Sequence, residues 1–406
     1  MALKSRNLFH RNKKTVDQNQ DSDSDSVSED ETPIIKKEKS RRPKENNFTQ
    51  QKLKAIHPII TPKYVIPLFL ILAVIFIPLG AGMLYGSYKV EDLTIDYTEC
   101  DSQSNSFETI PDDKFEANFK NEFSTAPKWK YSKNSSSEAT DEQGICNLQF
   151  TIPNDIGPAV FLLYRLENFY ANHRRFARSY SEDQLNGEDA SIKIIKDTVG
   201  QNCEPLSLDE NGKRIYPCGL IANSFFNDTF KGLSSSDGSD YEMTNKGIAW
   251  ATNKNRFKKT KYKASEIVPP PNWKKMYPDG YTDDNIPDIS KWSEFQNWMQ
   301  IPGLSTFSKL VLRNDDEVLK AGTYEVEIGM NWPVKEFNGK KSIYLTTRSV
   351  IGGRNPFLGI AWIVAGGICL ILSIVFLIIN LVVPRKMGDV SLLSWNQQPV
   401  KLEEDN

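Results

Sequence analysis

Two long apolar runs, one near each end of the chain, constrain its fold more than any other feature. Residues 65–85 and residues 357–383 contain no charged side chain. An α-helix rises 1.5 Å per residue, so each run is long enough to cross a hydrocarbon layer about 30 Å thick. The polar stretch between them has roughly 270 residues, the size of a domain with its own core. The sequence therefore predicts a membrane hairpin of two transmembrane helices that carries a large domain on one side.

The charges that flank the first run predict its orientation. Lysines are frequent before the run, whereas Lys89 follows it among acidic residues. Short cytosolic flanks carry an excess of Lys and Arg, so the N-terminus is expected in the cytosol and the large domain in the lumen or outside. The second run has basic residues on both sides and is less decisive. We assign the orientation from the first run. Because the chain crosses the membrane twice, both termini are then expected in the cytosol. The flanking basic residues are Lys44, Lys52, Lys54 and Lys63 before the first run, Lys340, Lys341, Arg348 and Arg354 before the second, and Arg385 and Lys386 after it.

The cysteines agree with this orientation. Cys100, Cys146, Cys203 and Cys218 all fall between the runs, and an even number there is typical of disulfides in an oxidising compartment. Three pairings are possible, and we favour the neighbour pairing of Cys100 with Cys146 and Cys203 with Cys218. Zinc binding is the alternative, but no C-x-x-C occurs and no histidine lies near these cysteines in the sequence. Cys369, inside the second run, is expected to be a small apolar packing residue or a lipidation site.

Three Asn-X-Ser/Thr sequons occur, at Asn47, Asn134 and Asn227. The predicted topology leaves Asn47 in the cytosol, where it cannot be glycosylated. Asn134 lies in a polar serine run that is expected to be an exposed loop, and Asn227 lies beside an aromatic pair. Asn134 and Asn227 are therefore the predicted glycosylation sites.

The remaining segments complete the expected organisation. An acidic serine-rich stretch at 21–31 has almost no apolar content and predicts disorder. Residues 48–56 predict a short helix along the bilayer surface. The net charge of −2 does not favour nucleic-acid binding. The expected parts are a disordered cytosolic tail at 1–45, a juxtamembrane amphipathic segment at 46–63, transmembrane helix 1 at 64–87, a lumenal domain at 88–355, transmembrane helix 2 at 356–383 and a cytosolic tail at 384–406.

Small residues four apart occur in both apolar runs. Gly82 and Gly86 form one such pair, and Ala361 and Ala365 form the other. Pairs of this kind allow close approach of helices, so these four residues are candidate helix-packing positions toward a partner. Small residues are frequent in membrane spans in any case, which weakens the signal.

The domain between the runs is expected to be β-rich, an antiparallel β-sandwich-like α+β fold. Candidate strands are 148–152, 322–330 and 341–347, and in 323–330 apolar and polar residues alternate with a period of two. A helical pattern is expected only around 160–180. Prolines between 269 and 287 indicate a long irregular excursion.

No catalytic constellation stands out. The three histidines are His10, His57 and His173, and only His173 lies in the large domain. The sequence has no G-x-S-x-G, P-loop or H-E-x-x-H motif. The chain is expected not to be an enzyme and to need no cofactor or metal. Charge-free spans also make it a poor candidate for a transporter on its own.

Several long motifs resemble the non-catalytic β-subunits of eukaryotic phospholipid flippases, the ligand-effect modulator family. The most specific is Tyr-Pro-Cys-Gly-Leu-Ile-Ala-Asn-Ser-Phe-Phe-Asn-Asp-Thr-Phe at 216–230. The basic run at 41–44 is similar to that of fungal members. The other matching segments are 48–53, 164–175, 247–250, 270–273, 298–299, 333–334, 352–355 and 393–395.

The resemblance implies an accessory subunit in a heterodimer with a type IV P-type ATPase. Such subunits bind the pump, help it leave the endoplasmic reticulum and support its movement of phospholipid to the cytosolic leaflet. The final membrane would be the trans-Golgi, endosomal or plasma membrane. In the family the four cysteines form two disulfides in the neighbour pairing, and Asn227 matches a family sequon. The alternative function is a two-span ligand-gated channel or receptor subunit, which would give a current where an accessory subunit would copurify with a pump.

Overall fold

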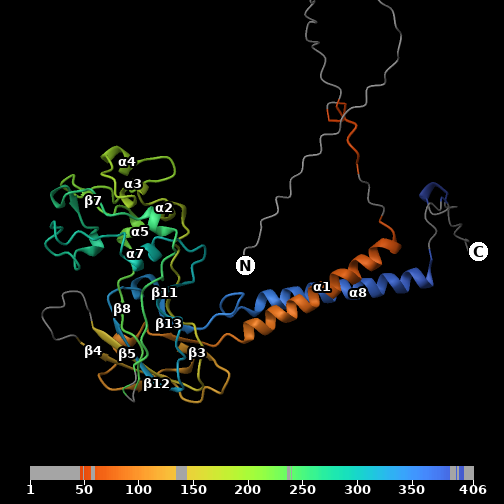
Figure 1. The fold of residues 1–406 in the computed structure, drawn as a ribbon, viewed down its shortest axis with the longest axis horizontal. Helices are drawn as coiled ribbons and strands as arrows, with labels where there is room; N and C mark the ends of the chain where they lie inside the picture. The colour runs from red at the N-terminus through yellow and green to blue at the C-terminus, as the bar shows by residue number, and fades with distance from the viewer. Residues whose placement is uncertain are drawn as a thin grey trace, which may run out of the picture. The chain divides into compact units, whose positions relative to one another are not determined.

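The computed structural model describes residues 46–48, 50–55, 60–133, 144–235, 238, 240–384, 390 and 393–396. The chain divides into two units, Met1–Ile59 and Ile60–Asn406, which are described separately (Figure 1). The predicted disordered tail at 1–45 and the sequon at Asn134 lie outside the described residues.

In the first unit, the helix predicted over 48–56 is wrong for the part that the structure describes. The backbone N–H of Gln50 donates to the carbonyl of Asn46 at 3.0 Å, which closes a single turn, and residues 52–55 have no regular structure. A helix this short forms few backbone hydrogen bonds for the residues it orders, and it is not stable without a surface to pack on.

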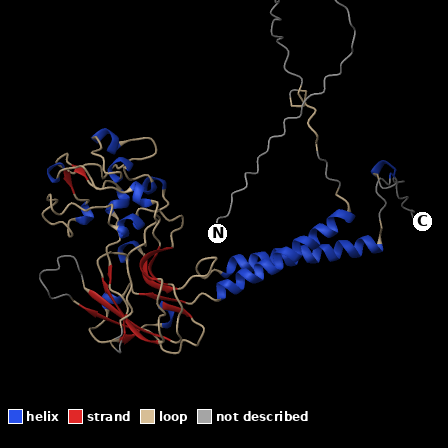
Figure 2. Ribbon diagram, in the orientation of Figure 1, coloured by secondary structure: helices blue, strands red, loops and turns tan. Residues whose placement is uncertain are grey.

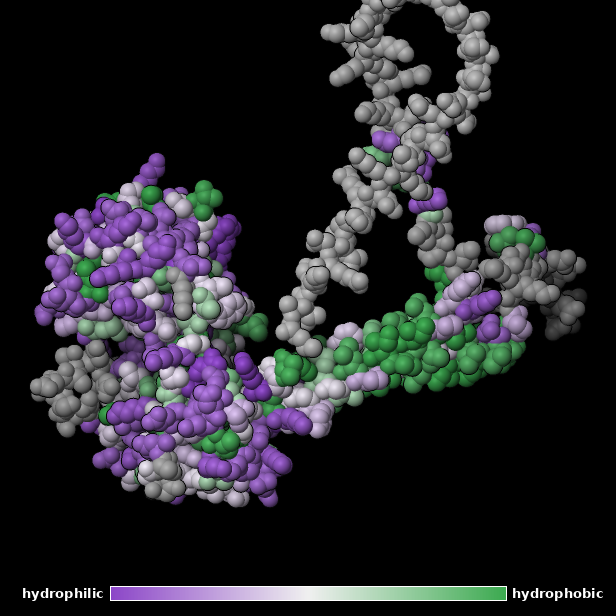
Figure 3. Space-filling model, in the orientation of Figure 1, coloured by the Kyte–Doolittle hydropathy of each residue, from purple (hydrophilic) through white to green (hydrophobic). Residues whose placement is uncertain are grey.

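Two helices of the second unit match the apolar runs. Helix α1 spans Pro62–Tyr88 and helix α8 spans Pro356–Val382, each long and apolar enough to cross a membrane. Both begin with proline in their first turn, where its missing N–H has no intrahelical partner to lose. Figure 3 shows that apolar residues cover most of this helix pair, in contrast to the polar surface of the rest of the unit.

Residues 89–355, here called the interspan domain, contain two main antiparallel sheets (Figure 2). The first sheet has the strand order β11-β6-β13-β1-β3, and the second follows β2-β4-β5-β12-β8, with β9 also paired to β12. The first sheet contains β1 (Asp92–Asp96), β3 (Phe115–Asn118), β6 (Val160–Glu167), β11 (Phe307–Asn314) and β13 (Lys340–Thr346). The second contains β2 (Glu108–Thr109), β4 (Lys128–Ser132), β5 (Ile145–Ile152), β8 (Thr229–Phe230), β9 (Ser234–Ser235) and β12 (Gly322–Gly329).

The two sheets share one apolar core, which makes the domain a β-sandwich. Ile95 and Ile343 from the first sheet belong to the same buried cluster as Phe150 and Val326 from the second. The predicted alternation in β12 is confirmed, because its buried side chains are every second residue up to Ile328. Burial of these apolar faces supplies the main driving force for closing the sandwich.

The helical pattern predicted for 160–180 is wrong. Residues Val160–Glu167 form strand β6, and the helix that follows, α2, covers only Arg174–Ala177. Val160, Leu162 and Leu166 are each at most 1 % exposed, so β6 buries its apolar residues with a period of two. On its other face only Phe161 is buried, whereas Leu163, Arg165 and Glu167 are half-buried.

A second core lies among short helices and loops that are inserted between the strands. Trp273 and Trp298 are buried there, and their indole N–H groups donate to the carbonyls of Ala222 and Ile221 at 2.9 and 2.8 Å. These bonds satisfy the end of helix α5, which has too few residues to stabilise itself. The helices are α2, α3 (Glu182–Leu185), α4 (Ile192–Lys196), α5 (Leu220–Asn223), α6 (Asn253–Arg256) and α7 (Ser293–Trp298); β7 (Arg214–Ile215) and β10 (Ile267–Val268) pair in parallel.

A buried lysine holds the end of helix α7. The ammonium group of Lys309 donates to the backbone carbonyl of Asn297 at 2.7 Å and also to that of Gln300. Burial disfavours the charged form and lowers the pKa of Lys309 to about 8. The positive charge lies where the helix leaves its carbonyls unpaired, a favourable position for a cation.

A buried carboxylate, Asp228, joins the two sheets. Its Oδ2 accepts a bond from Lys341 of β13 at 2.7 Å and one from the Tyr97 hydroxyl at 2.9 Å. Its Oδ1 accepts from the backbone N–H groups of Asn331 and Trp332 at 2.6 and 2.7 Å. The Asp228 and Lys341 side chains are 0 % and 3 % exposed. Burial and the adjacent Asp228 charge raise the pKa of Tyr97 well above its usual range, so the hydroxyl remains a donor.

The Asp228→Asn variant should unfold more readily than the wild type. It leaves the Lys341 ammonium buried without a counter-charge, and breaking a buried pair in this way costs roughly 3–5 kcal/mol. Denaturant unfolding of the purified chain measures the effect. The substitution keeps the Asn-X-Thr sequon at 227–229.

Two further variants separate charge from packing in this prediction. The double variant Asp228→Asn/Lys341→Met should recover part of the lost stability, because neither side chain is then charged. The exposed Asp155–Lys320 pair offers the control, and Asp155→Asn should leave unfolding unchanged. Equal destabilisation by Asp228→Asn and Asp155→Asn would contradict the assigned role.

Candidate functional site

The contact between the two membrane helices is built on small residues seven apart. Helix α1 buries Ala73, Gly80 and Ser87. Helix α8 buries Gly359, Gly366 and Ser373 in the same way. A spacing of seven returns to nearly the same side of a helix every two turns, so each row forms one straight seam. In a membrane, where apolar burial supplies little attraction between helices, such close contact is what holds a pair together.

The glycines in this seam cannot be replaced without moving backbone. A Cβ atom on Gly80 would lie 2.8 Å from the carbonyl oxygen of Gly359 and 2.8 Å from the backbone nitrogen of Ile363. A Cβ on Gly359 would lie 2.8 Å from the backbone nitrogen of Leu84. The two helices are therefore in backbone contact at this level, and only glycine fits.

Polar and aromatic contacts fix the register of the pair along its length. The Ser373 hydroxyl donates to the carbonyl of Ile66 at 3.2 Å near one end. Near the other end, the backbone N–H of Asn355 donates to the Ser87 hydroxyl at 2.8 Å. Between them, the rings of Phe76 and Trp362 meet edge to face at 4.6 Å. The two hydrogen bonds and the ring contact fix the register of the antiparallel helices relative to one another.

The residues singled out from the sequence lie away from this seam. A Cβ atom on Gly82 would meet nothing within 4 Å, and Gly82 is exposed. Gly86 lies beside the side chain of Ile351, and Ala361 and Ala365 are half-buried. The spacing of four between small residues did not indicate Gly80, Gly359 and Gly366. The spacing of seven between small residues in both apolar runs is the signal that could have found them.

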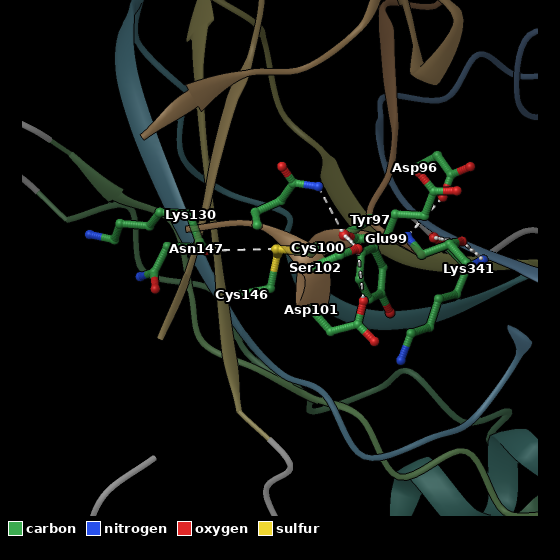
Figure 4. Close-up of a disulfide and its surroundings, with 12 residues drawn as sticks. Asp96, Tyr97, Glu99, Cys100, Asp101, Ser102, Lys130, Cys146, Asn147 and Lys341 are labelled. Atoms are coloured by element: carbon green, nitrogen blue, oxygen red, sulfur yellow. Dashed lines mark hydrogen bonds between the residues drawn. A yellow bond between two sulfur atoms is a disulfide. The ribbon is translucent and has the colours of Figure 1, made fainter. Parts of the chain in front are cut away.

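The structure joins Cys100 to Cys146, which places a covalent bond between the two sheets. Cys100 begins the 3₁₀ turn Cys100–Ser102 that follows β1, whereas Cys146 lies in β5. Figure 4 shows this disulfide beside the side chains of Tyr97 and Lys341. The disulfide and the Asp228 ion pair therefore bridge the sandwich in the same neighbourhood. Closing a loop of 46 residues is worth about 4 kcal/mol in the chain-entropy model.

The second disulfide joins Cys203 to Cys218 across 15 residues. It lies in a small buried cluster of its own with Ala190, Ile195 and Ile215. A cluster of this size buries too little apolar surface to order the loops around it. The disulfide, worth about 3 kcal/mol in the same model, supplies the missing constraint.

Asn227 lies immediately before Asp228 and lines a cavity of about 670 Å³. The cavity wall also includes Trp273, Trp332 and Phe337, so it combines aromatic surface with polar groups. The Asn227 carbonyl accepts a bond from the Asn331 side chain at 3.1 Å, which holds the sequon backbone in place. Thr229, the third residue of the sequon, is exposed in β8.

His173 is exposed and lines a second cleft with Arg174, Arg175 and Arg178. Asp197 and Glu204 also line this cleft, so it carries both signs of charge. Among the described residues, no group of three or more His, Cys, Asp or Glu side chains is arranged to hold a metal ion. The described residues form a stiff scaffold, with two cross-linked sheets and a closely packed helix pair.

Comparison with known proteins identifies this scaffold. A model of the LEM3 (ligand-effect modulator 3) family / CDC50 family matches residues 83–386. The chain belongs to this family. It is 46% identical over 388 residues to the phospholipid-transporting ATPase accessory subunit LEM3 of Saccharomyces cerevisiae, covering 94% of each chain. It is 41% identical to the accessory subunit CDC50 of Chaetomium thermophilum, covering 93% of this chain and 95% of that one.

The match extends beyond fungi. Cell cycle control protein 50A of Bos taurus is 36% identical over 365 residues, covering 84% of this chain and 90% of that protein. The resemblance stated from the motifs is therefore confirmed. The motif at 216–230 supplies Tyr216, Ile221 and Phe226 of the second core as well as Asp228, so its residues build the scaffold.

The Gly80→Ala variant should destabilise the helix pair, and Gly82→Ala should not. The added methyl group at Gly80 must push α8 away, an overpacking cost of roughly 1–3 kcal/mol. At Gly82 it meets open space, and alanine favours the helix by up to about 1 kcal/mol over glycine. Thermal unfolding of the detergent-purified chain compares them. A lower midpoint for Gly82→Ala than for Gly80→Ala would refute the assigned contact.

Proposed function

We propose that this chain is the accessory subunit of a phospholipid-transporting type IV P-type ATPase and forms a heterodimer with it. The observation that carries the proposal is the 46% identity that extends over 94% of both chains to a protein with that printed description. Identity over the full length retains both helices and the interspan domain, the parts that an accessory subunit needs. The pump would hydrolyse ATP and move phospholipid to the cytosolic leaflet.

The side chains of this chain support a role in which the pump, and not this subunit, performs the chemistry. Residues 65–85 and 357–383 carry no charge, so neither span offers a polar path for a lipid headgroup. The buried charged side chains of Asp228 and Lys341 face one another and bind backbone atoms. We propose that the chain performs no chemistry and contributes binding surface and stability to its pump.

The proposed pump-binding surface in the membrane includes the side of α1 that carries Gly82. This side is free of contact with α8, because the seam uses Gly80 and Ser87 instead. Gly82 offers open space into which a ridge of a pump helix could fit. The half-buried residues Gly86, Ala361 and Ala365 are proposed to extend this surface.

The proposed topology has both termini in the cytosol and the interspan domain in the lumen or outside. Two disulfides in that domain fit an oxidising compartment. Glycosylation is proposed at Asn227, which lines the cavity of about 670 Å³, and at Asn134. We further propose that the subunit helps the pump leave the endoplasmic reticulum for the trans-Golgi, endosomal or plasma membrane.

Copurification tests the partnership. A tagged chain should retain a large P-type ATPase, and pump ATPase activity should be lost without this chain and return when it is added. The Gly82→Leu variant should weaken copurification, because a large side chain there would occupy the space proposed for the pump helix. The purified chain alone should neither hydrolyse ATP nor translocate lipid.

The matched control is Val375→Leu, an exposed apolar exchange on α8 that adds one methylene without filling a glycine gap. It should leave copurification unchanged. Lipid translocation by the chain in pump-free liposomes would overturn the proposal, and an inward current from the expressed chain would favour the channel alternative.

Glycan mapping tests the topology. Endoglycosidase should increase the mobility of the protein, and Asn227→Gln should remove one glycan. Asn47→Gln should change nothing, because Asn47 is proposed to face the cytosol. Loss of a glycan in Asn47→Gln but not in Asn227→Gln would show that the orientation is inverted.

A further inference from the structure

A tight turn at Ser349–Gly352 presents two aliphatic side chains just before α8. The backbone N–H of Ser349 donates to the carbonyl of Gly352 at 2.8 Å, and the reverse bond measures 3.0 Å. Gly352 has φ +120°, a conformation that other residues rarely adopt. Val350 at the tip is 107 % exposed, and Ile351 is 54 % exposed. An aliphatic pair at the tip of a closed turn is unfavourable in water.

The turn is held at the level of the last turn of α1. A Cβ atom on Gly86 would lie 3.5 Å from the Ile351 side chain, so Ile351 packs against the span. A few residues later, Asn355 bonds to Ser87 of α1 and begins α8. The tip therefore lies beside the end of a membrane helix and cannot be far from the edge of the hydrocarbon layer.

The surroundings have the composition of a membrane–water boundary. Tyr85 and Tyr88 are 65 % and 57 % exposed in the last turn of α1. The Arg354 guanidinium lies over the Tyr88 ring at 5.5 Å, and the Lys89 ammonium lies over the Tyr85 ring at 4.6 Å. Tyrosines and basic side chains with apolar stems concentrate at the headgroup level, where their polar ends stay wet.

We propose that the Ser349–Gly352 turn inserts Val350 and Ile351 into the leaflet that faces the interspan domain. The turn is suited to this position because most of its polar backbone is satisfied internally. The Ser349 and Gly352 groups bond to one another, and the Ile351 N–H donates to the Ser349 hydroxyl at 3.3 Å. Insertion thus buries two aliphatic side chains and leaves few unpaired backbone groups in the apolar layer. Arg354 is placed to meet the lipid phosphates.

The ligand of this surface is the lipid itself, at the acyl–headgroup boundary, and no pump is needed for the contact. A second turn in the same chain provides a matched control. Thr198 and Gln201 bridge one another around Val199, which is 100 % exposed and has no membrane helix beside it. Only the Ser349–Gly352 turn lies beside a membrane helix. A label at 350 that is quenched by lipid-bound nitroxides, when a label at 199 is not, therefore indicates contact with the bilayer.

Depth-dependent quenching of a fluorescent label tests the proposal. Cys369, the free cysteine, is replaced in the full-length chain by Cys369→Ala, and the two disulfides are kept. A nitrobenzoxadiazole label is attached through Val350→Cys, Val199→Cys or Val364→Cys, the last an exposed position within α8. Each protein is reconstituted into phosphatidylcholine vesicles that carry a nitroxide on the headgroup or deep on the acyl chain, in both leaflets.

The label at 350 should be quenched by both nitroxide lipids and more strongly by the headgroup nitroxide, because the boundary lies about 5–10 Å below the surface. The label at 364 should respond more to the deep nitroxide, and the label at 199 to neither. Equal quenching of the labels at 350 and 199 would overturn the proposal. So would shielding of the 350 label that requires the copurified pump, which would identify the turn as a protein contact. The quenching of the three labels in pump-free vesicles does not depend on whether the chain is a pump subunit.

Discussion

The buried Asp228 carboxylate is the interaction on which the interspan domain depends. A buried charge is tolerated only when a counter-charge and hydrogen bonds replace its hydration. Lys341, Tyr97 and two backbone N–H groups supply these to Asp228. Lys341 lies in β13 and Tyr97 follows β1 of the first sheet, whereas the two N–H groups follow β12 of the second. The sandwich must therefore close in one register before the carboxylate is satisfied. The Cys100–Cys146 bond then constrains the same neighbourhood covalently.

This arrangement gives the motif at 216–230 a structural role. Asp228 connects the sheets, and Phe226 stacks on Tyr164 of β6 at 3.9 Å. The carbonyls of Ile221 and Ala222 receive the two indole N–H groups of the second core. Each position is restricted by a contact with a distant segment. A change at any of them affects several elements at once, so the motif is a structural constraint.

Much of the fold could be predicted from the sequence, because its strongest signals are local. The charge-free runs predicted α1 and α8, and the alternation at 323–330 predicted β12. Strand β6 was missed because Phe161 and Leu163 on its other face are also apolar, which obscures the period of two in the sequence. The seam glycines were missed because a spacing of four was considered, whereas the small residues of the seam repeat every seven residues. The partners of Asp228 lie 103 to 131 residues away, and no local pattern indicates which buried groups will meet.

The seam between the helices links the fold to its proposed use. Backbone contact at Gly80 and Gly359, with polar bonds at both ends, makes the pair a rigid unit without any help from a partner. A rigid pair exposes its remaining sides to lipid or to another protein without first losing conformational entropy, and preorganisation of this kind favours association. Helices that already hold each other in register need only complementary packing from a pump. The same rigidity carries the Ser349–Gly352 turn, because Ile351 packs on α1 and Asn355 bonds to Ser87. The packing of α1 against α8 therefore determines which helix surface is offered to a partner. It also fixes where the proposed membrane-inserting turn lies relative to the spans.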